Sequence, residues 1–122
     1  MQESATRQAL GKRGEHVAAE FYARRGATIL ARNIHYPVGE LDLIVREPNG
    51  TVVFVEVKTR SSGAYGNAES VTRSKLAKMR KAAARWLLDR PYSLVRFDVI
   101  ALTATGDEFA LDLFEGVEDG AC

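Results

Sequence analysis

Four charged side chains interrupt two apolar runs in the middle of this chain, and their types and spacing suit metal-assisted chemistry. Glu40 and Asp42 lie in the first run, and Glu56 and Lys58 lie in the second. Both runs are otherwise rich in Val, Leu and Ile, and a Glu-Pro-Asn-Gly turn at residues 47–50 joins them, which is typical of an antiparallel β-hairpin. Charges in such strands are partly desolvated, so their presence needs a physical reason.

The register of the hairpin supplies that reason. A hairpin that turns about Asn49 places Asp42 opposite Glu56 and Glu40 opposite Lys58, and opposite residues project from the same face. Two facing carboxylates repel each other unless a proton or a cation lies between them. Oxygen ligands from Asp42 and Glu56, completed by water, are what Mg²⁺ or Mn²⁺ requires. The sequence therefore predicts a divalent-metal site with Lys58 beside it.

A structural salt bridge is the competing interpretation of the same residues. Lys58 could pair with Glu40 or with Glu56, and ion-pair networks of purely structural value also perturb charged groups. That interpretation leaves Asp42 unexplained, whereas the metal site gives it a role as a ligand.

The remaining patterns predict one α/β domain over residues 1–122, with its core at about 5–114. The expected helices run from about Ser4 to Arg25 and from Ser70 or Thr72 to Asp89, and the expected strands are 27–34, the two arms of the hairpin, 94–102 and 108–114. Residues 35–38 and 59–67 are predicted loops, and residues 115–122 are expected to form a disordered tail.

Each predicted helix carries a charged residue that could approach the acidic cluster. Glu15 lies at the edge of the buried stripe of the first helix, on the side of Ala18 and Tyr22. It could point toward the sheet, although a solvated glutamate is the simpler interpretation. Lys75 lies near the start of the second predicted helix, which follows the Ser/Gly-rich loop after Lys58. This position brings Lys75 within reach of the acidic cluster.

Two further features call for a structural explanation. Gly11 and Gly14 each weaken a helix interior by roughly 1 kcal/mol relative to Ala, which predicts close approach of another backbone. Asp98 lies in an apolar strand, where we expect a structural role, paired near Arg96 or with Arg60.

The near-neutral net charge of +1 conceals an uneven distribution. Residues 7–32 hold six Arg and Lys against two acids, residues 58–96 hold ten against two, and residues 97–122 hold seven acids and no base. A basic region beside the hairpin could attract a polyanion, while the simpler interpretation is a solvated helix surface.

Composition excludes several classes of protein. No apolar run approaches the roughly 20 residues that span a bilayer, and the N-terminus lacks the apolar segment of a signal peptide, so we expect a cytoplasmic protein without membrane contact. The single cysteine, Cys122, excludes an intrachain disulfide and a cysteine-based zinc site.

These residues carry a resemblance to a known group of proteins. Asp42 followed by Glu56-Val57-Lys58, in a helix, three strands, helix, strand order, resembles the core of the PD-(D/E)xK nuclease superfamily, and more closely the YraN family of bacterial predicted endonucleases. The matching motifs are Gly11-x-x-Gly14-Glu15 with Ala18, Arg32-Asn33, Gly39 to Ile44, Val53 to Arg60, Tyr65-Gly66, Lys75 and Arg96 to Val99.

The resemblance implies a fold and a set of roles. It implies a three-layer, restriction-endonuclease-like α/β core of αβββαβ order, with a central mixed sheet flanked by helices. Asp42 and Glu56 become ligands of Mg²⁺ or Mn²⁺, Lys58 the catalytic lysine, and Glu15 a further catalytic acid, as in the Holliday junction resolvase-like branch. Glu40, Arg60 and Lys75 are expected to take supporting or nucleic-acid-binding roles. The family pattern assigns Glu40 no chemical role, and only its register opposite Lys58 suggests that it sets the position or charge of that lysine.

The first functional hypothesis is therefore a Mg²⁺-dependent endonuclease that acts on DNA, including branched or junction DNA. Cutting two strands of a junction would require a homodimer. The second hypothesis is a non-catalytic nucleic-acid-binding or accessory protein that retains the nuclease fold. The third is a protein in which the hairpin charges form only a salt-bridge network.

Overall fold

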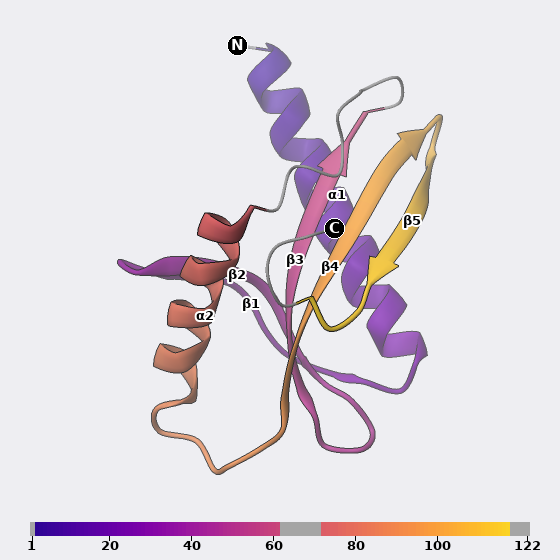
Figure 1. Cartoon of the computed structure of the whole chain (residues 1–122). Helices are drawn as coiled ribbons and strands as arrows, with labels where there is room; N and C mark the ends of the chain where they lie inside the picture. Colours follow the sequence, from indigo (N-terminus) through magenta and orange to yellow (C-terminus); the bar gives the residue numbers. More distant parts are fainter. Residues whose placement is uncertain (1, 62–71, 118–122) are drawn as a thin grey trace.

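The computed structural model describes residues 2–61 and 72–117, and within them the helices and strands follow the predicted order (Figure 1). The elements are α1 (Gln2–Arg24), β1 (Thr28–Tyr36), β2 (Gly39–Arg46), β3 (Val52–Arg60), α2 (Arg73–Leu87), β4 (Val95–Thr105) and β5 (Glu108–Phe114). Neither helix in this part of the chain is long and apolar enough to cross a bilayer.

All five strands join one mixed sheet in the order β1-β2-β3-β4-β5. Strands β3 and β4 pair in parallel, and the other neighbours pair antiparallel. A parallel pair needs a crossover connection, and α2 supplies it between β3 and β4. In the central hairpin Leu43 faces Val55 and Ile44 faces Phe54, so the predicted register is confirmed.

The two helices cover opposite faces of the sheet, which gives the predicted three layers (Figure 1). Alternate residues of β3, and residues 43–45 of β2, point to opposite faces, because side chains in a strand alternate. Leu41 and Leu43 lie in opposite cores although they are two residues apart, so the alternation breaks where the pairing of β2 with β3 ends. The core under α1 contains Ala18, Ala19, Tyr22, Ala27, Leu43, Val45, Val53, Val55, Ile100 and Leu102. The core under α2 contains Leu41, Ile44, Val52, Phe54, Ala82, Ala83 and Trp86. The α/β class and the layered core are thus confirmed.

Strand β1 is longer than predicted, because its last residues pair across a tight turn. His35 and Tyr36, predicted as loop, pair with Glu40 and Gly39, so that only residues 37–38 form the turn. This pairing brings an aromatic side chain to the end of the β1–β2 hairpin.

The predicted loop after β3 also begins later than expected. Thr59 and Arg60 belong to β3 and continue its parallel pairing with β4 as far as Thr103. The part of this predicted loop from residue 62 onward lies outside the described residues.

The expectation of a disordered tail from residue 115 is wrong for its first residues. The backbone N–H of Gly116 donates to a carboxylate oxygen of Asp98 at 3.1 Å, and that of Val117 donates to the carbonyl of Phe97 at 2.9 Å. These bonds fix the chain after β5 against β4. Residues 118–122 lie outside the described part of the chain.

Asp98 has the structural role predicted for it, at the centre of a buried polar network. Its carboxylate is fully buried and accepts hydrogen bonds from the Tyr22 hydroxyl at 2.7 Å and from Nε and Nη2 of Arg96 at 2.9 Å each. Nη2 of Arg96 also donates to Glu47 at 2.9 Å, and Arg25 donates to the same carboxylate at 2.7 Å. The hydrogen bond to Asp98 raises the pKa of Arg96. The network ties α1, the hairpin turn and β4 together.

One of the two glycines in α1 marks a close approach between layers. A Cβ at Gly14 would lie within 3.1 Å of Thr59 Cβ and would overlap its hydroxyl, whereas a Cβ at Gly11 would meet nothing within 4 Å. The predicted close approach therefore holds for Gly14 alone, and the approaching group is the Thr59 side chain rather than a backbone.

Alanine at the two glycines should change stability in opposite directions. We expect Gly14→Ala to lower the free energy of unfolding by about 1–3 kcal/mol, because α1 must move away from β3. Gly11→Ala should raise it by about 1 kcal/mol, because Ala favours a helix interior. Urea denaturation of both variants checks this expectation, and a stable Gly14→Ala protein would show that the helix does not rest on Thr59.

Candidate active site

The candidate active site begins where β2 separates from β3. The main-chain ladder pairs the two strands as far as Leu43 and Val55. One residue further, a side chain replaces the main chain in the contact between the strands: Oδ2 of Asp42 accepts a hydrogen bond from the Val57 N–H at 2.9 Å. Glu56 follows Phe54 on the face of α2 and is only 5% exposed. The register thus brings two carboxylates into a largely dry site.

The carboxylate of Asp42 is held in an unfavourable environment. Burial and the charge of Glu56 raise the pKa of Asp42 from 3.8 to about 6, although the Val57 N–H and the charge of Lys75 act in the opposite direction. A carboxyl group that takes up a proton this readily also favours a neighbouring cation.

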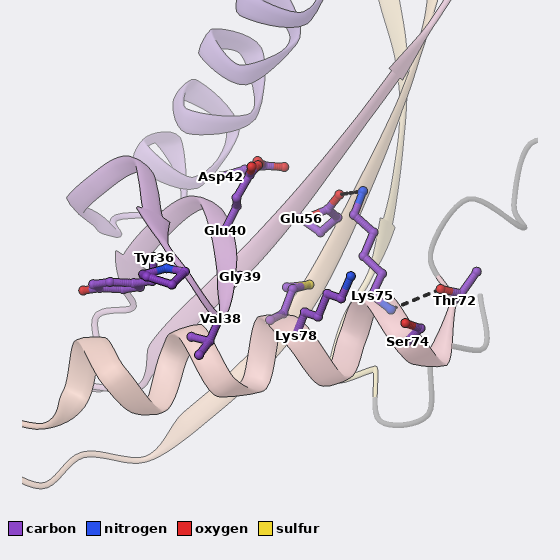
Figure 2. A pocket seen from close by; sticks show the side chains of 12 residues that line it. Tyr36, Val38, Gly39, Glu40, Asp42, Glu56, Thr72, Ser74, Lys75 and Lys78 are labelled. Carbon is purple, nitrogen blue, oxygen red and sulfur yellow. Dashed lines mark hydrogen bonds and ion pairs between the residues drawn. The ribbon is translucent and has the colours of Figure 1, made fainter.

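Lys75 supplies a cation to Glu56 in this structure. Its Nζ lies 2.7 Å from Oε2 of Glu56, and Figure 2 shows the side chain reaching from α2 to β3. Burial works against the charge of Lys75, but the hydrogen bond to Glu56 and the charges of Glu56 and Asp42 raise its pKa. The predicted reach of Lys75 to the acidic cluster is therefore confirmed.

Lys58 differs from Lys75 in its electrostatic surroundings. Burial and the neighbouring charge of Lys75 lower the pKa of Lys58, and Arg60 adds to the effect. Glu56 opposes this shift without cancelling it. An amine with a lowered pKa exchanges protons more readily near neutral pH than an ordinary lysine does.

Glu15 reaches the same site from the other side of the sheet. A recess of about 280 Å³ is lined by Gly11, Glu15, Asp42, Glu56, Val57, Lys58, Thr59 and Lys75. Both helices and both central strands contribute to it, because β2 leaves β3 at this point and opens the sheet. The structure thus gathers Asp42, Glu56, Lys58 and Glu15, the four predicted catalytic residues, around one recess.

A larger cavity of about 510 Å³ lies next to this recess and shares Asp42, Glu56 and Lys75 with it. It lies between the β1–β2 turn and the first turns of α2 (Figure 2). Its lining is Tyr36, Pro37, Val38, Gly39, Glu40, Asp42, Glu56, Thr72, Ser74, Lys75, Lys78 and Met79.

The structure assigns Glu40 a different neighbour from the one expected. Its Oε2 lies 3.4 Å from Nδ1 of His35, its partner across the β1–β2 hairpin, and its side chain is 68% exposed. Glu40 lines the larger cavity, whereas Lys58 lines the recess. The expectation that Glu40 positions Lys58 is therefore wrong, because β2 has already separated from β3 at this point.

Asp42 and Glu56 offer enough carboxylate ligands for Mg²⁺ but too few for a metal that needs three or more protein ligands. Within residues 2–61 and 72–117, no group of three or more His, Cys, Asp or Glu is arranged to hold a metal ion. Mg²⁺ usually keeps several waters and binds proteins through one or two carboxylates plus substrate phosphates. Asp42 and Glu56 supply two such carboxylates, so the residues present suit this ion better than a metal that needs a complete protein cage.

Two groups near the carboxylates were missed by sequence reasoning. Lys78 lies one helical turn after Lys75 and lines the larger cavity, a position that the spacing of three residues could have indicated. The sequence predicts a loop at Tyr36, and its place beside the cavity depends on strand pairing that the local sequence does not reveal.

Replacing Asp42 by Asn should stabilise the protein at neutral pH. The raised pKa means that the folded state loses stability from this group as the pH increases from about 4 to about 6, and Asn removes that loss while still accepting the Val57 hydrogen bond. We expect a gain of about 1–3 kcal/mol at about pH 7.5 that largely disappears at about pH 4.5.

Urea denaturation at both pH values measures the difference. Asp112→Asn, at an exposed aspartate of β5, is the matched control and should change little at either pH. A less stable Asp42→Asn protein at about pH 7.5 would contradict the electrostatic account.

Comparison with known proteins identifies relatives that match most of the chain. The model of the uncharacterised protein family UPF0102 matches residues 14–102. A UPF0102 protein of Corynebacterium efficiens is 53% identical over 117 residues, which cover 94% of this chain and 96% of that protein. One from Corynebacterium diphtheriae is 47% identical over 112 residues, covering 89% and 90% of the two chains.

A bacterium of another genus supplies a third relative. A UPF0102 protein of Bifidobacterium longum is 48% identical over 97 residues, which cover 75% of this chain and 78% of that protein. The family match contains the carboxylates, Lys58 and all of α2. The chain therefore belongs to the uncharacterised protein family UPF0102.

Proposed function

We propose that this protein is a Mg²⁺-dependent endonuclease that hydrolyses phosphodiester bonds in DNA. The observation that carries the proposal is the pair of desolvated carboxylates, Asp42 and Glu56, with Lys58 at the same recess. Two acids and a lysine in this order on a central hairpin also resemble the PD-(D/E)xK superfamily. The resolvase-like branch of that superfamily makes branched DNA a reasonable first substrate.

Each group at the recess has a role in such a reaction. Asp42 and Glu56 would hold the ion. The chemistry that Mg²⁺ supplies when bound is polarisation of the phosphodiester and a lower pKa for an attacking water. Lys58 would orient that water or stabilise the negative charge that develops on the phosphate. Glu15, half-buried on α1, would add a proton acceptor on the far side of the recess.

The surface around the site supports DNA as the substrate. The exposed side of α2 carries five cations, Arg73, Lys78, Arg80, Lys81 and Arg85. Such cations neutralise phosphates and release counterions, so binding should weaken steeply as salt increases.

A non-catalytic DNA-binding protein is the alternative, and one observation favours it. The ammonium group of Lys75 already lies 2.7 Å from Glu56, so the site has an internal counter-ion. Endonuclease activity requires Mg²⁺ to compete with that ion pair, whereas a binding protein would leave it intact.

Cleavage assays on linear, flapped and four-way DNA distinguish the two proposals. We expect wild-type protein to cut at least one substrate in Mg²⁺ and to be inactive in EDTA. Asp42→Asn and Lys58→Met should each lower the rate by about 100-fold or more, since each removes a group that stabilises the transition state. Asp112→Asn should cut as wild type does.

The opposite results are equally informative. Cleavage that Asp42→Asn leaves undiminished would refute the assignment of the site. DNA binding without cleavage, equal in wild type and Asp42→Asn and independent of Mg²⁺, would establish the binding protein instead.

A further inference from the structure

We propose that the larger cavity accepts one unpaired nucleotide of the DNA strand that is cut. The proposal rests on the proposed endonuclease function and specifies its substrate class, namely DNA with a base outside the helical stack beside the scissile phosphate. The cavity shares Asp42 and Glu56 with the recess, so a phosphate at the carboxylates has its neighbouring nucleotide at the cavity.

The cavity has the size and the stiffness of a ligand site. Its volume of about 510 Å³ falls within the range of about 300–1,000 Å³ typical of small-molecule sites. One wall of the cavity comes from the β1–β2 hairpin and the other from α2, and the two are in contact at Gly39. A Cβ added there would lie within 3.1 Å of the Lys78 carbonyl carbon. The start of β2 therefore rests on the backbone of α2, and the cavity exists before any ligand arrives.

One wall suits a nucleobase. Tyr36, Pro37 and Val38 form an apolar and aromatic side of the cavity, with Met79 on the opposite helix. Val38 is 45% exposed and lines the same cavity as the two carboxylates. The guanidinium of Arg85 lies 5.4 Å from the centre of the Tyr36 ring and covers part of it, which holds the ring in place. Stacking on an aromatic side chain binds bases of any identity.

The charges of the cavity orient the nucleotide. Lys75 and Lys78 come from α2 and attract the phosphate, whereas Glu40 comes from β2 and repels it (Figure 2). The phosphate therefore belongs on the α2 side, and the base belongs on the side of Tyr36 and Val38. There the carboxylate of Glu40 can accept hydrogen bonds from an exocyclic amino group.

A paired base cannot use this cavity without leaving its stack. Extrusion of a base from a duplex costs free energy, and the cost is smallest for a base that is already unpaired. The cavity therefore favours bulges, flaps and junction branch points over uniform duplex.

Binding to matched DNA probes tests the proposal without relying on cleavage. Fluorescein-labelled duplexes of about 20 base pairs are compared in EDTA by anisotropy: one fully paired, one with a single-nucleotide bulge, and one with the same bulge lacking its base. The abasic bulge controls for flexibility. We expect the bulge with a base to bind about fivefold to tenfold tighter than the abasic bulge.

Two variants alter the cavity in different ways. Ser74→Trp fills it from the exposed start of α2, and Tyr36→Leu removes its aromatic wall. Both should reduce the preference for the base to less than about twofold while keeping the affinity for paired duplex. Tyr92→Leu, at a tyrosine that is 90% exposed and lies outside this cavity, is the matched control and should keep the preference.

Equal affinity for the two bulges, or a preference that survives both cavity variants with folded protein by circular dichroism, would overturn the proposal. Cleavage of the same probes in Mg²⁺ separates the two proposals. Cleavage without a base preference refutes only the nucleotide site, whereas a base preference without cleavage supports the nucleotide site and refutes the endonuclease.

Discussion

The structure depends on two carboxylates that face each other where the central hairpin opens. Asp42 and Glu56 lie in strands whose other residues pack two apolar cores, so neither is freely solvated. An isolated pair of this kind destabilises a fold, because burial and mutual repulsion both oppose ionisation. The ammonium group of Lys75 and the N–H of Val57 offset part of the cost. The remaining cost is the burial of Asp42 and its repulsion from Glu56, and a divalent ion bound between the two carboxylates would lower it.

The rest of the fold holds that pair in position. Helix α1 approaches β3 closely at Gly14, and the start of β2 rests on α2 at Gly39, so both helices are fixed relative to the opened hairpin. At the other end of the hairpin, the buried network around Asp98 ties the turn to α1 and β4. The site is therefore carried on strands and helices held from both ends, which suits a site that must keep charged groups in a fixed arrangement.

Local patterns were sufficient to predict the hairpin and much of its charged cluster. Alternation along two strands and a short turn determine which residues face each other, so the ladder that ends at Leu43 and Val55, one residue short of the two carboxylates, could be read from the sequence. The contacts of Tyr22 with Asp98 and of Glu47 with Arg96 could not, because these partners are far apart in the chain and meet only after the layers pack. The neighbour of Glu40 was mispredicted for a related reason, since ideal pairing was assumed beyond the point where the strands separate.

Diffraction from crystals soaked in Mn²⁺, with data collected at the manganese absorption edge, tests the central claim most directly. Our account predicts an anomalous peak between the carboxylates of Asp42 and Glu56, with Nζ of Lys75 moved away from the position where it now lies 2.7 Å from Glu56. The ion would replace the lysine as counter-ion and complete its coordination with water. No peak at saturating Mn²⁺, together with an intact ion pair between Lys75 and Glu56, would contradict the account.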